Sequence, residues 1–465
     1  MLLPAASVSA SAPPCWRRPS NPGNPGHRTA TLQQGQLLEL PSPAKTTNDE
    51  RTTADGAWLA VLAAGIVAAM HIWKLPAALA GIQADLGTTL VQAGLLLGII
   101  QLASVVGGLA TAVGGELAGL RRLMVSGLVL LSGASVLGAA APTTELLMAA
   151  RTLEGVGFLL AVVVAPALIR KVAPQRRLNV ALASWGAFQG MATLTGLAAG
   201  ALFLQTAGWR EWWLVMALLT LLPVSLVLRQ VPRDVPPADA GLRHALRRVG
   251  RTVAAPQPWI IGVAFACYTA QWMAVLGFLP SIYRSAGLEG PLPGILSAVV
   301  GGVNAIGALG AGPLIQRGLS ERKIIFWTFL AMSAASVATF AADWEHIGNG
   351  IVFQFILIAV FSAVGGLIPA AVTRYSVHVA PADGSVTAVL GLTQQIFNVG
   401  NFLGPMLFAL LATTTGGWET TWWLTCGLSL LGMGLLALLA PVRGGTASGG
   451  HRPGKSLSAQ RKGSM

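Results

Sequence analysis

Charged side chains are scarce in this sequence. Lys, Arg, Asp and Glu make up 10% of the 465 residues, whereas 54% of the residues are hydrophobic. About a quarter of the residues of a soluble globular domain are charged, so this composition excludes an ordinary soluble domain and indicates a membrane protein. Acidic residues are fewer than basic ones, with 17 Asp and Glu against 30 Lys and Arg. In a soluble protein this excess would suggest nucleic acid, but in a membrane protein it is expected on cytoplasmic loops.

Cysteine is also rare. Cys15, Cys267 and Cys426 lie far apart, and two of them stand in apolar stretches. This spacing supports neither a disulfide framework nor a metal knuckle. The six histidines are scattered without ligand spacing, so we expect no metal and no cofactor. The first 56 residues lack the continuous apolar segment of a signal peptide.

Long apolar stretches fill the rest of the chain. Each is long enough for one membrane-spanning helix of about 20 residues. They lie at about 57–80, 91–115, 123–141, 146–169, 179–205, 212–229, 259–283, 293–316, 324–342, 350–373, 387–412 and 421–441. The predicted fold class is therefore an all-α integral membrane protein with twelve transmembrane helices.

The longest break between these stretches is rich in proline and arginine, which indicates a polar linker between two halves. The predicted organisation is a disordered cytoplasmic tail at 1–56, a six-helix bundle at 57–229, a cytoplasmic linker at 230–258, a second six-helix bundle at 259–441 and a cytoplasmic tail at 442–465.

The basic residues fix the expected orientation. With the N-terminus inside, the inner connections carry 16 Lys and Arg, while the outer connections carry only Arg210 and Arg284. The positive-inside rule then places both termini in the cytoplasm. Because this charge is spread over loops and contains no groove-reading motif, we expect no nucleic-acid partner.

The two predicted halves repeat one another. Leu75-Pro76 recurs as Leu279-Pro280, and Val172-Ala173-Pro174 recurs as Val379-Ala380-Pro381. The segment from Gly208 to Leu214, Gly-Trp-Arg-Glu-Trp-Trp-Leu, returns as Gly-Trp-Glu-Thr-Thr-Trp-Trp-Leu from Gly417 to Leu424. Such internal repetition indicates two bundles of like topology, related by pseudo-symmetry.

The connection after the second predicted helix reads Ala-Val-Gly-Gly-Glu-Leu-Ala-Gly-Leu-Arg-Arg from Ala112 to Arg122, and that after the eighth reads Gly-Pro-Leu-Ile-Gln-Arg-Gly from Gly312 to Gly318. Both resemble the inner-loop signature of the major facilitator superfamily, Gly-x-x-x-Asp-Arg-x-Gly-Arg-Arg. Small residues allow close helix approach, and an acid at a helix end can latch the cytoplasmic side shut. The alternative is an ordinary basic turn. The candidate gating residues are Glu116, Gly119, Arg121 and Arg122 in the first copy and Gly312, Gln316 and Arg317 in the second.

The fourth predicted helix matches the same superfamily's Arg-x-x-x-Gly-x-Gly pattern at Arg151, Gly155 and Gly157. The chain thus resembles a major facilitator superfamily transporter over almost all of 57–441. Further stretches, among them 71–76, 82–87 and 165–170, resemble the bacterial cyanate-permease branch. The resemblance implies a fold of two six-helix bundles, with helices one, four, seven and ten lining a central cavity.

Only four ionisable groups lie well inside the predicted spans: His71 and Lys74 in the first, Arg151 and Glu154 in the fourth. Charged groups in hydrocarbon must pair or face a wet cavity. The resemblance implies that these four can face one another in the cavity, where their net charge of +1 or +2 favours a small anion. The alternatives are a structural ion pair for Arg151 and Glu154, and snorkelling to the headgroups for Lys74.

The facing half offers uncharged polar groups. Tyr268, Gln271 and Trp272 lie on the seventh predicted helix, and Gln394 and Asn398, with Gln395 and Asn401, lie on the eleventh. These groups could orient a substrate whose charge is held by the first half. For the amides, hydrogen bonding between helices is the competing interpretation.

The predicted function is secondary active transport of a small anion across the bacterial inner membrane, coupled to protons and carried out by a monomer. Drug efflux is the alternative within transport. An enzyme is not predicted, since no catalytic constellation is present, and no appended domain supports a sensor. Gly449 to Ser456 satisfies the P-loop expression, but it lies in a Gly/Ser-rich tail without the strand and helix that a P-loop needs, so no nucleotide is expected.

Overall fold

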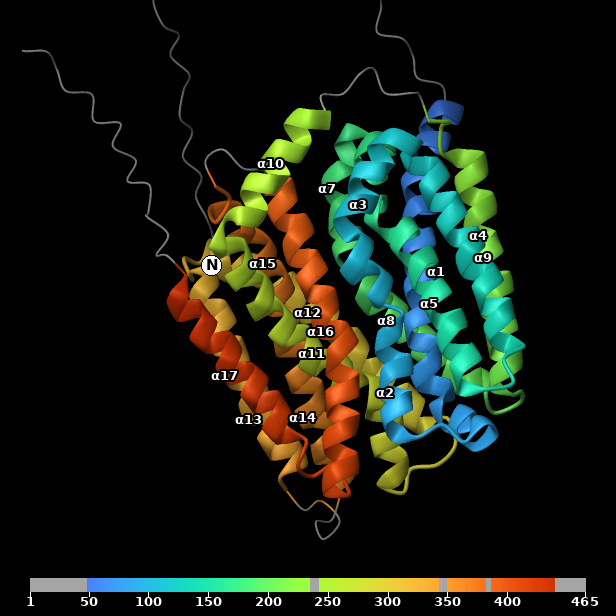
Figure 1. Cartoon of the computed structure of the whole chain (residues 1–465), viewed down its shortest axis with the longest axis vertical. Coiled ribbons are helices and arrows are strands. Elements are labelled where there is room, and N and C mark those ends of the chain that lie inside the picture. Colours follow the sequence, from blue (N-terminus) through green and yellow to red (C-terminus); the bar gives the residue numbers. More distant parts are fainter. Residues whose placement is uncertain (1–47, 235–241, 343, 345–348, 382–385, 440–465) are drawn as a thin grey trace, which may run out of the picture. The chain divides into compact units, whose positions relative to one another are not determined.

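The computed structural model describes residues 48–234, 242–342, 344, 349–381 and 386–439, and within these ranges every regular element is helical (Figure 1). The first half comprises α1 (Asn48–Leu86), α2 (Leu90–Ile99), α3 (Leu102–Ala118), α4 (Leu120–Ala139), α5 (Thr144–Val163), α6 (Ala165–Val172), α7 (Leu178–Gly186), α8 (Phe188–Phe203) and α9 (Trp209–Gln230), with one 3₁₀ turn at Gln175–Arg177.

The second half comprises α11 (Pro256–Ser285), α12 (Leu292–Gln316), α13 (Glu321–Phe340), α14 (Gly350–Gly365), α15 (Leu367–His378), α16 (Val386–Thr415) and α17 (Trp422–Leu438). Among the described residues, ten helices are long and apolar enough to cross a membrane, and Phe188–Phe203 and Trp422–Leu438 are shorter apolar helices. These twelve correspond to the twelve predicted stretches, which confirms the predicted all-α membrane fold class.

Four of the predicted spans are each broken into two helices. The breaks lie at Ile100–Gln101, at Val164, at Ala187 and at Gly366. Two of them precede a proline, because Pro166 stands in the first turn of α6 and Pro369 in the first turn of α15. Proline has no N–H to donate to the preceding turn, so a new helix begins where it occurs.

The structure adds detail at two of the predicted boundaries. The linker 230–258 contains a helix, α10 (Leu242–Ala254), and α1 begins at Asn48, within the segment that was expected to be a disordered tail. The apolar residues of α10 recur with helical spacing and are interspersed with arginines, a pattern typical of an amphipathic helix. The predicted division into domains stays a prediction. Residues 1–47 and 440–465, with the P-loop match, lie outside the described ranges.

The two halves meet through four helix pairs. Helices α2 and α3 pack against α16, α8 packs against α12, and α1 packs against α11. Glycine permits the closest approaches, since a Cβ on Gly98 would lie 2.2 Å from the Phe402 carbonyl oxygen and a Cβ on Gly94 would lie 2.6 Å from that of Pro405. Small residues at helix interfaces allow this backbone contact in membranes.

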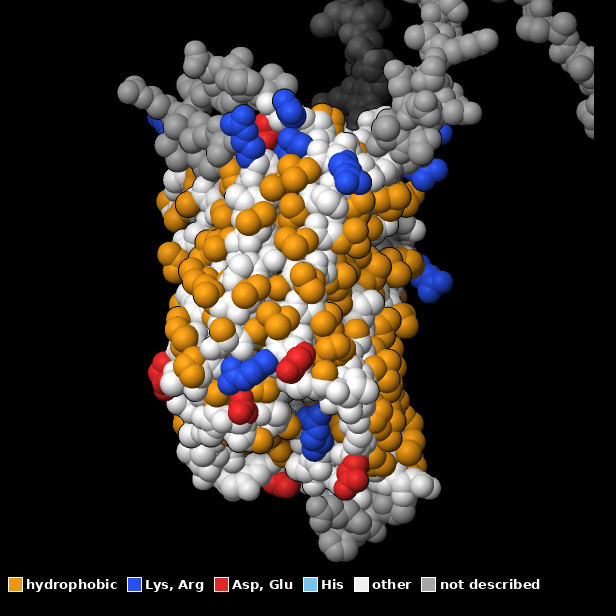
Figure 2. Space-filling model, turned by 90° about the vertical axis from the view of Figure 1, so that its right-hand side faces the viewer, with side chains coloured by type: hydrophobic (Ala, Val, Ile, Leu, Met, Phe, Trp, Pro, Cys, Tyr) orange, Lys and Arg blue, Asp and Glu red, His pale blue; other side chains and the backbone are white. Residues whose placement is uncertain are grey.

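The surface has the distribution expected of a membrane protein. Figure 2 shows apolar side chains over the middle of one face, Lys and Arg gathered at the upper end, and groups of both signs at the lower end. We call the end where Lys and Arg gather the basic end. The α3–α4 and α12–α13 connections lie beside the C-terminal ends of α9 and α17, since Arg121 contacts Leu228 and Arg322 contacts Leu436. By the order of the helices these connections belong to the basic end, with Arg121, Arg122, Arg317, Arg322 and Lys323. The positive-inside rule predicts that this end faces the cytoplasm.

Gly98→Ala should destabilise the protein by about 1–3 kcal/mol, the usual cost of overpacking, because the group that it strikes is backbone and cannot rotate away. Gly133→Ala is the matched control, since nothing lies within 4 Å of its added Cβ, and it should be neutral or slightly stabilising. Thermal unfolding of both variants in one detergent measures the difference. Equal midpoints would contradict the close packing at Gly98.

Candidate functional site

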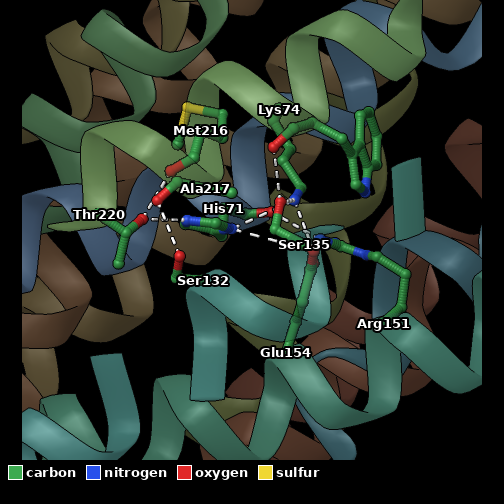
Figure 3. A network of polar contacts seen from close by, with 10 residues as sticks. His71, Lys74, Ser132, Ser135, Arg151, Glu154, Met216, Ala217 and Thr220 are labelled. Atoms are coloured by element: carbon green, nitrogen blue, oxygen red, sulfur yellow. Dashed lines mark hydrogen bonds and ion pairs between the residues drawn. The ribbon is translucent and has the colours of Figure 1, made fainter. Parts of the chain in front are cut away.

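The four ionisable groups predicted from the sequence lie together in one network (Figure 3). His71 and Lys74 come from α1, and Arg151 and Glu154 come from α5. All four side chains are fully buried. Side chains of α4 and α9 complete the network. Helix α4 packs against α5, α9 packs against α1, and α4 and α9 pack against each other. It therefore lies inside the first half.

Glu154 joins the two cations. Its Oε1 accepts a hydrogen bond from Lys74 Nζ at 2.5 Å, and its Oε2 accepts one from Arg151 Nη1 at 2.7 Å. A single carboxylate thus uses both oxygens, each against a different cation. Charge-assisted hydrogen bonds of this kind are among the strongest in proteins.

Lys74 uses all three of its N–H donors. Besides Glu154, its ammonium group contacts Ser135 Oγ at 2.7 Å and His71 Nδ1 at 3.2 Å. It also lies 4.4 Å from the centre of the Trp213 ring, a cation–π contact. Full coordination at this depth excludes snorkelling of Lys74 to the headgroups, the alternative that the sequence left open.

The hydrogen bonds indicate the tautomer of His71. Thr220 Oγ1 donates to the Met216 carbonyl at 2.7 Å, so its lone pair can accept a hydrogen bond from His71 Nε2, which lies 2.8 Å away. His71 Nδ1 then accepts from Lys74. This pattern is that of a neutral imidazole with its proton on Nε2. A second proton would place N–H against the lysine ammonium group.

Arg151 is only partly satisfied. Its Nη1 donates to Glu154 and, at 2.6 Å, to the His71 carbonyl oxygen, while Nε and Nη2 are buried without a hydrogen-bond partner among the described residues. Nε and Nη2 form the edge of the guanidinium group that binds carboxylates and similar oxyanions in bidentate fashion. The edge that remains is thus suited to a planar oxyanion.

With a neutral His71, the network holds two cations and one anion, a net charge of +1 in a fully buried place. Such an excess is costly in a low-dielectric interior unless an anion offsets it. The arrangement therefore has the charge and, within the described ranges, the free hydrogen-bond donors that an anion needs.

Three members of the network were missed by sequence reasoning: Ser135 on α4, and Trp213 and Thr220 on α9. Trp213 belongs to the repeated Gly-Trp-Arg-Glu-Trp-Trp segment, which was recognised as a repeat but given no role. Ser and Thr are common in transmembrane helices, where they bond the backbone of their own helix, so nothing distinguished Ser135 and Thr220.

The polar groups of the facing half form a separate network. Trp272 Nε1 donates to Ser362 Oγ at 3.1 Å, and Asn304 on α12 donates to the Tyr268 hydroxyl at 3.1 Å. Trp272 also meets Trp73 of α1 edge to face, with ring centroids 5.4 Å apart. This aromatic pair, rather than a charged group, joins α1 to α11 between the halves.

The predicted amides are dispersed. Gln271 lies between its own helix and α17, since it donates to the Cys267 carbonyl and accepts from Ser429 Oγ. Asn398 donates to the Gln394 carbonyl of its own helix, and the Gln394 side chain is exposed. Gln395 crosses to the first half and donates to the Val105 carbonyl. Gln271 and Gln395 therefore make hydrogen bonds between helices, as the alternative to a substrate-binding role supposes.

The first loop signature is bound to the end of the first half. Asp234, just after α9, accepts hydrogen bonds from the backbone N–H groups of Arg121 and Arg122 and so caps the N-terminus of α4. The Arg121 side chain donates to the Leu228 carbonyl at 2.7 Å. Gly119 has a φ of 94° and lies so close to Asp234 that a side chain would clash. The side chain of Glu116 lies outside the described part.

The second copy is simpler. Gln316 is the last residue of α12 and Arg317 its C-cap, and the Arg317 side chain is exposed. A Cβ on Gly312 would meet nothing within 4 Å. A gating role for either copy remains a prediction from the sequence.

Comparison with models of protein families identifies the family of this chain. The family model described as "Major Facilitator Superfamily" matches residues 58–317 and 261–462, which together cover most of the sequence. The chain belongs to the major facilitator superfamily. Members of this superfamily are transporters, so the chain is a multi-pass membrane transporter and not an enzyme. The match is to the superfamily as a whole, and the likeness to its cyanate-permease branch stays a prediction.

Solved structures show the same fold. The crystal structure of a D-xylose-proton symporter is similar with a TM-score of 0.66 and 14% sequence identity, over 83% of this chain and 98% of that one. A bacterial homologue of the human lysosomal transporter Spinster, in inward-facing conformations, matches with TM-scores of 0.59 when occupied and 0.61 when unoccupied, at 17% and 15% identity. These two matches cover 82% and 85% of this chain and 93% and 95% of the other.

Two proteins of Mycobacterium tuberculosis, from different strains, are each named a "probable multidrug-efflux transporter". Each is 39% identical to this chain over 109 residues. That stretch is 23% of this chain and 23% of each relative, so the similarity spans about a quarter of their length.

The ionic network predicts unequal costs for removing its members. Glu154→Gln leaves two buried cations without a counter-charge and should destabilise the protein by about 3–5 kcal/mol. Lys74→Met leaves Arg151 and Glu154 as an ion pair with no net charge, so it should lower the free energy of unfolding by less than half as much. Glu145→Gln, an exposed acid in the first turn of α5, is the matched control and should change little. Unfolding of the three variants in one detergent tests the order, and a smaller loss for Glu154→Gln than for Lys74→Met would contradict it.

Proposed function

We propose that this chain is a proton-coupled secondary transporter of a small anion, with the network of His71, Lys74, Arg151 and Glu154 as its binding and coupling site. The basic end would face the cytoplasm of a bacterial cell, with both termini on that side. The two halves would rock about their contacts so that the site opens to one side at a time.

The observation that carries this proposal is an asymmetry between the repeated halves. Aligning Leu75-Pro76 with Leu279-Pro280 sets His71 and Lys74 opposite Val275 and Phe278. Aligning Val172-Ala173-Pro174 with Val379-Ala380-Pro381 sets Arg151 opposite Ile358 and Glu154 opposite Phe361. These two counterparts are also apolar.

All four counterparts are buried, at 3% exposure or less. Apolar side chains therefore fill the same places of the fold in the second half. The fold does not need ions there, and buried polar groups in a membrane protein are expensive. An ionic network that packing does not require is a candidate functional site.

An anionic substrate follows from the charge and from Arg151. The network carries a net charge of +1, and the edge formed by Arg151 Nε and Nη2 has no partner within the described part of the chain. A carboxylate or a similar planar oxyanion would satisfy both donors and neutralise the excess charge. A hydrophobic cation would meet repulsion from both Lys74 and Arg151.

Coupling follows from the position of Glu154 between the two cations. A proton on Glu154 raises the positive charge around Arg151 and so favours the anion, and by reciprocity a bound anion favours the proton. His71 is the competing carrier, because its Nδ1 lies 4.0 Å from Glu154 Oε1 and could exchange a proton with the same group.

Glu154→Gln should abolish proton-driven accumulation of substrate but leave exchange of substrate for substrate partly intact, since exchange needs rocking and no net proton movement. His71→Gln should give this phenotype only if the imidazole is the carrier. Uptake and counterflow in vesicles, with and without a pH gradient, measure the two activities. If correctly inserted Glu154→Gln loses both, the residue is structural and the coupling role fails.

Arg151→Gln should reduce substrate affinity at least tenfold, because it removes the charge and the bidentate edge together. Arg151→Lys separates these contributions: it should recover part of the affinity if charge dominates, and none if the two-pronged edge is needed. Substrate affinity measured by uptake at varied concentration is the readout. Wild-type affinity in Arg151→Gln would rule out the site.

Efflux of an amphipathic compound is a second candidate, favoured by the two Mycobacterium tuberculosis relatives that carry that name. The same vesicles distinguish the two functions. Transport of hydrophobic cations that is insensitive to Arg151→Gln would favour efflux, whereas accumulation of small carboxylates or cyanate would favour the anion carrier.

A further inference from the structure

Two grooves flank one helix at the basic end of the second half. The first, of about 160 Å³, lies between α13, the end of α12 and the α14–α15 junction. The second, of about 470 Å³, lies between α13 and the end of α17. Both are lined by Lys323 and Trp327, which stand one helical turn apart on α13. The two grooves thus form one surface, which we call the α13 surface.

The mouth of this surface is positive. Lys323 is exposed, and no acid among the described residues pairs with it. Arg322 stays close to the second groove because its Nη2 donates to the Leu436 carbonyl at 2.6 Å. The neighbouring acid, Glu321, is engaged by Arg374 at 3.0 Å. Ser320 caps the N-terminus of α13, whose helix dipole adds to the positive potential.

Below the charges the surface is apolar. Trp327 is 61% exposed and Phe326 41% exposed, although both belong to a helix that is apolar enough to span the membrane. Leucines line the first groove, and Met433, Leu436 and Ala437 line the second. A charged mouth above apolar grooves with an exposed tryptophan is the pattern of a phospholipid site near a membrane interface.

One buried hydroxyl points to a ligand independently of the charges. Thr328 lines the first groove, is 1% exposed, and its Oγ1 has no hydrogen-bond partner in the described part of the chain. Thr339, on the same helix, instead donates to the Ala335 carbonyl one turn earlier. Thr328 lies about 7.5 Å along the helix from Lys323, at 1.5 Å per residue. A hydroxyl at that depth suits an ester oxygen beneath a headgroup phosphate.

We propose that the α13 surface binds an anionic glycerophospholipid of the leaflet at the basic end. The phosphate contacts Lys323 and Arg322, an ester oxygen accepts from Thr328, and the acyl chains follow the grooves beside Trp327. Two cations without a free acid favour an anionic headgroup over a zwitterionic one. The apolar grooves give no affinity to a soluble phosphate, so the lipid is the occupant.

Native mass spectrometry of the full-length chain, titrated with phosphatidylglycerol and with phosphatidylcholine, tests this site. The wild type should retain phosphatidylglycerol more tightly. Lys323→Gln should lower that affinity about fivefold, the effect of one lysine near an anionic surface. Lys171→Gln, an exposed lysine of the first half at the same end, is the matched control and should have no effect.

Two further variants separate the groove from the charge. Thr328→Val should weaken both lipids, because the ester is common to them, and Ala437→Trp should weaken both by narrowing the second groove. The proposal is overturned if Lys323→Gln binds phosphatidylglycerol as the wild type does, if Lys171→Gln loses as much, or if inorganic phosphate displaces the lipid. Thermal midpoints equal to that of the wild type show that each variant is folded.

Discussion

The structure of the first half depends on one constraint: two buried cations share a single acid. Glu154 contacts both Lys74 and Arg151, so α1 and α5 cannot shift relative to each other without leaving a charge unpaired. Lys74 in turn fixes Ser135 on α4 and Trp213 on α9. Packing and electrostatics therefore hold the same four helices, and the arrangement leaves one edge of Arg151 for a further partner.

The second half repeats the frame without the charges. Phe278, the counterpart of Lys74, packs against Phe408 and Trp418, so aromatic contacts fill the place that ions occupy in the first half. The buried cationic groups of this network thus belong to the first half, and apolar side chains occupy the corresponding places of the second.

The contacts between the halves bear on the proposed rocking. They include glycines against backbone, as at Gly98 and Gly94, the Trp73–Trp272 pair, and the hydrogen bond from Gln395 to the Val105 carbonyl. Because the ionic network lies within one half, the halves can separate at this interface without pulling an ion pair apart. Close backbone contacts between small residues are worth little individually, so breaking a set of them is compatible with alternating access.

The sequence by itself determined the spans, the repeat and the four ionisable residues. Each follows from a local cost, since every charged residue in hydrocarbon is expensive wherever its helix lies. Only the tertiary structure decided what those residues contact. The rotation of α1 about its axis turns Lys74 toward Ser135 and Trp213 and leaves Trp73 for Trp272. The charged network and the Tyr268–Trp272 network are separate for this reason. The rotation of a helix depends on contacts between side chains far apart in sequence, such as Lys74 and Ser135, which are more than 60 residues apart. No local sequence pattern contains that information.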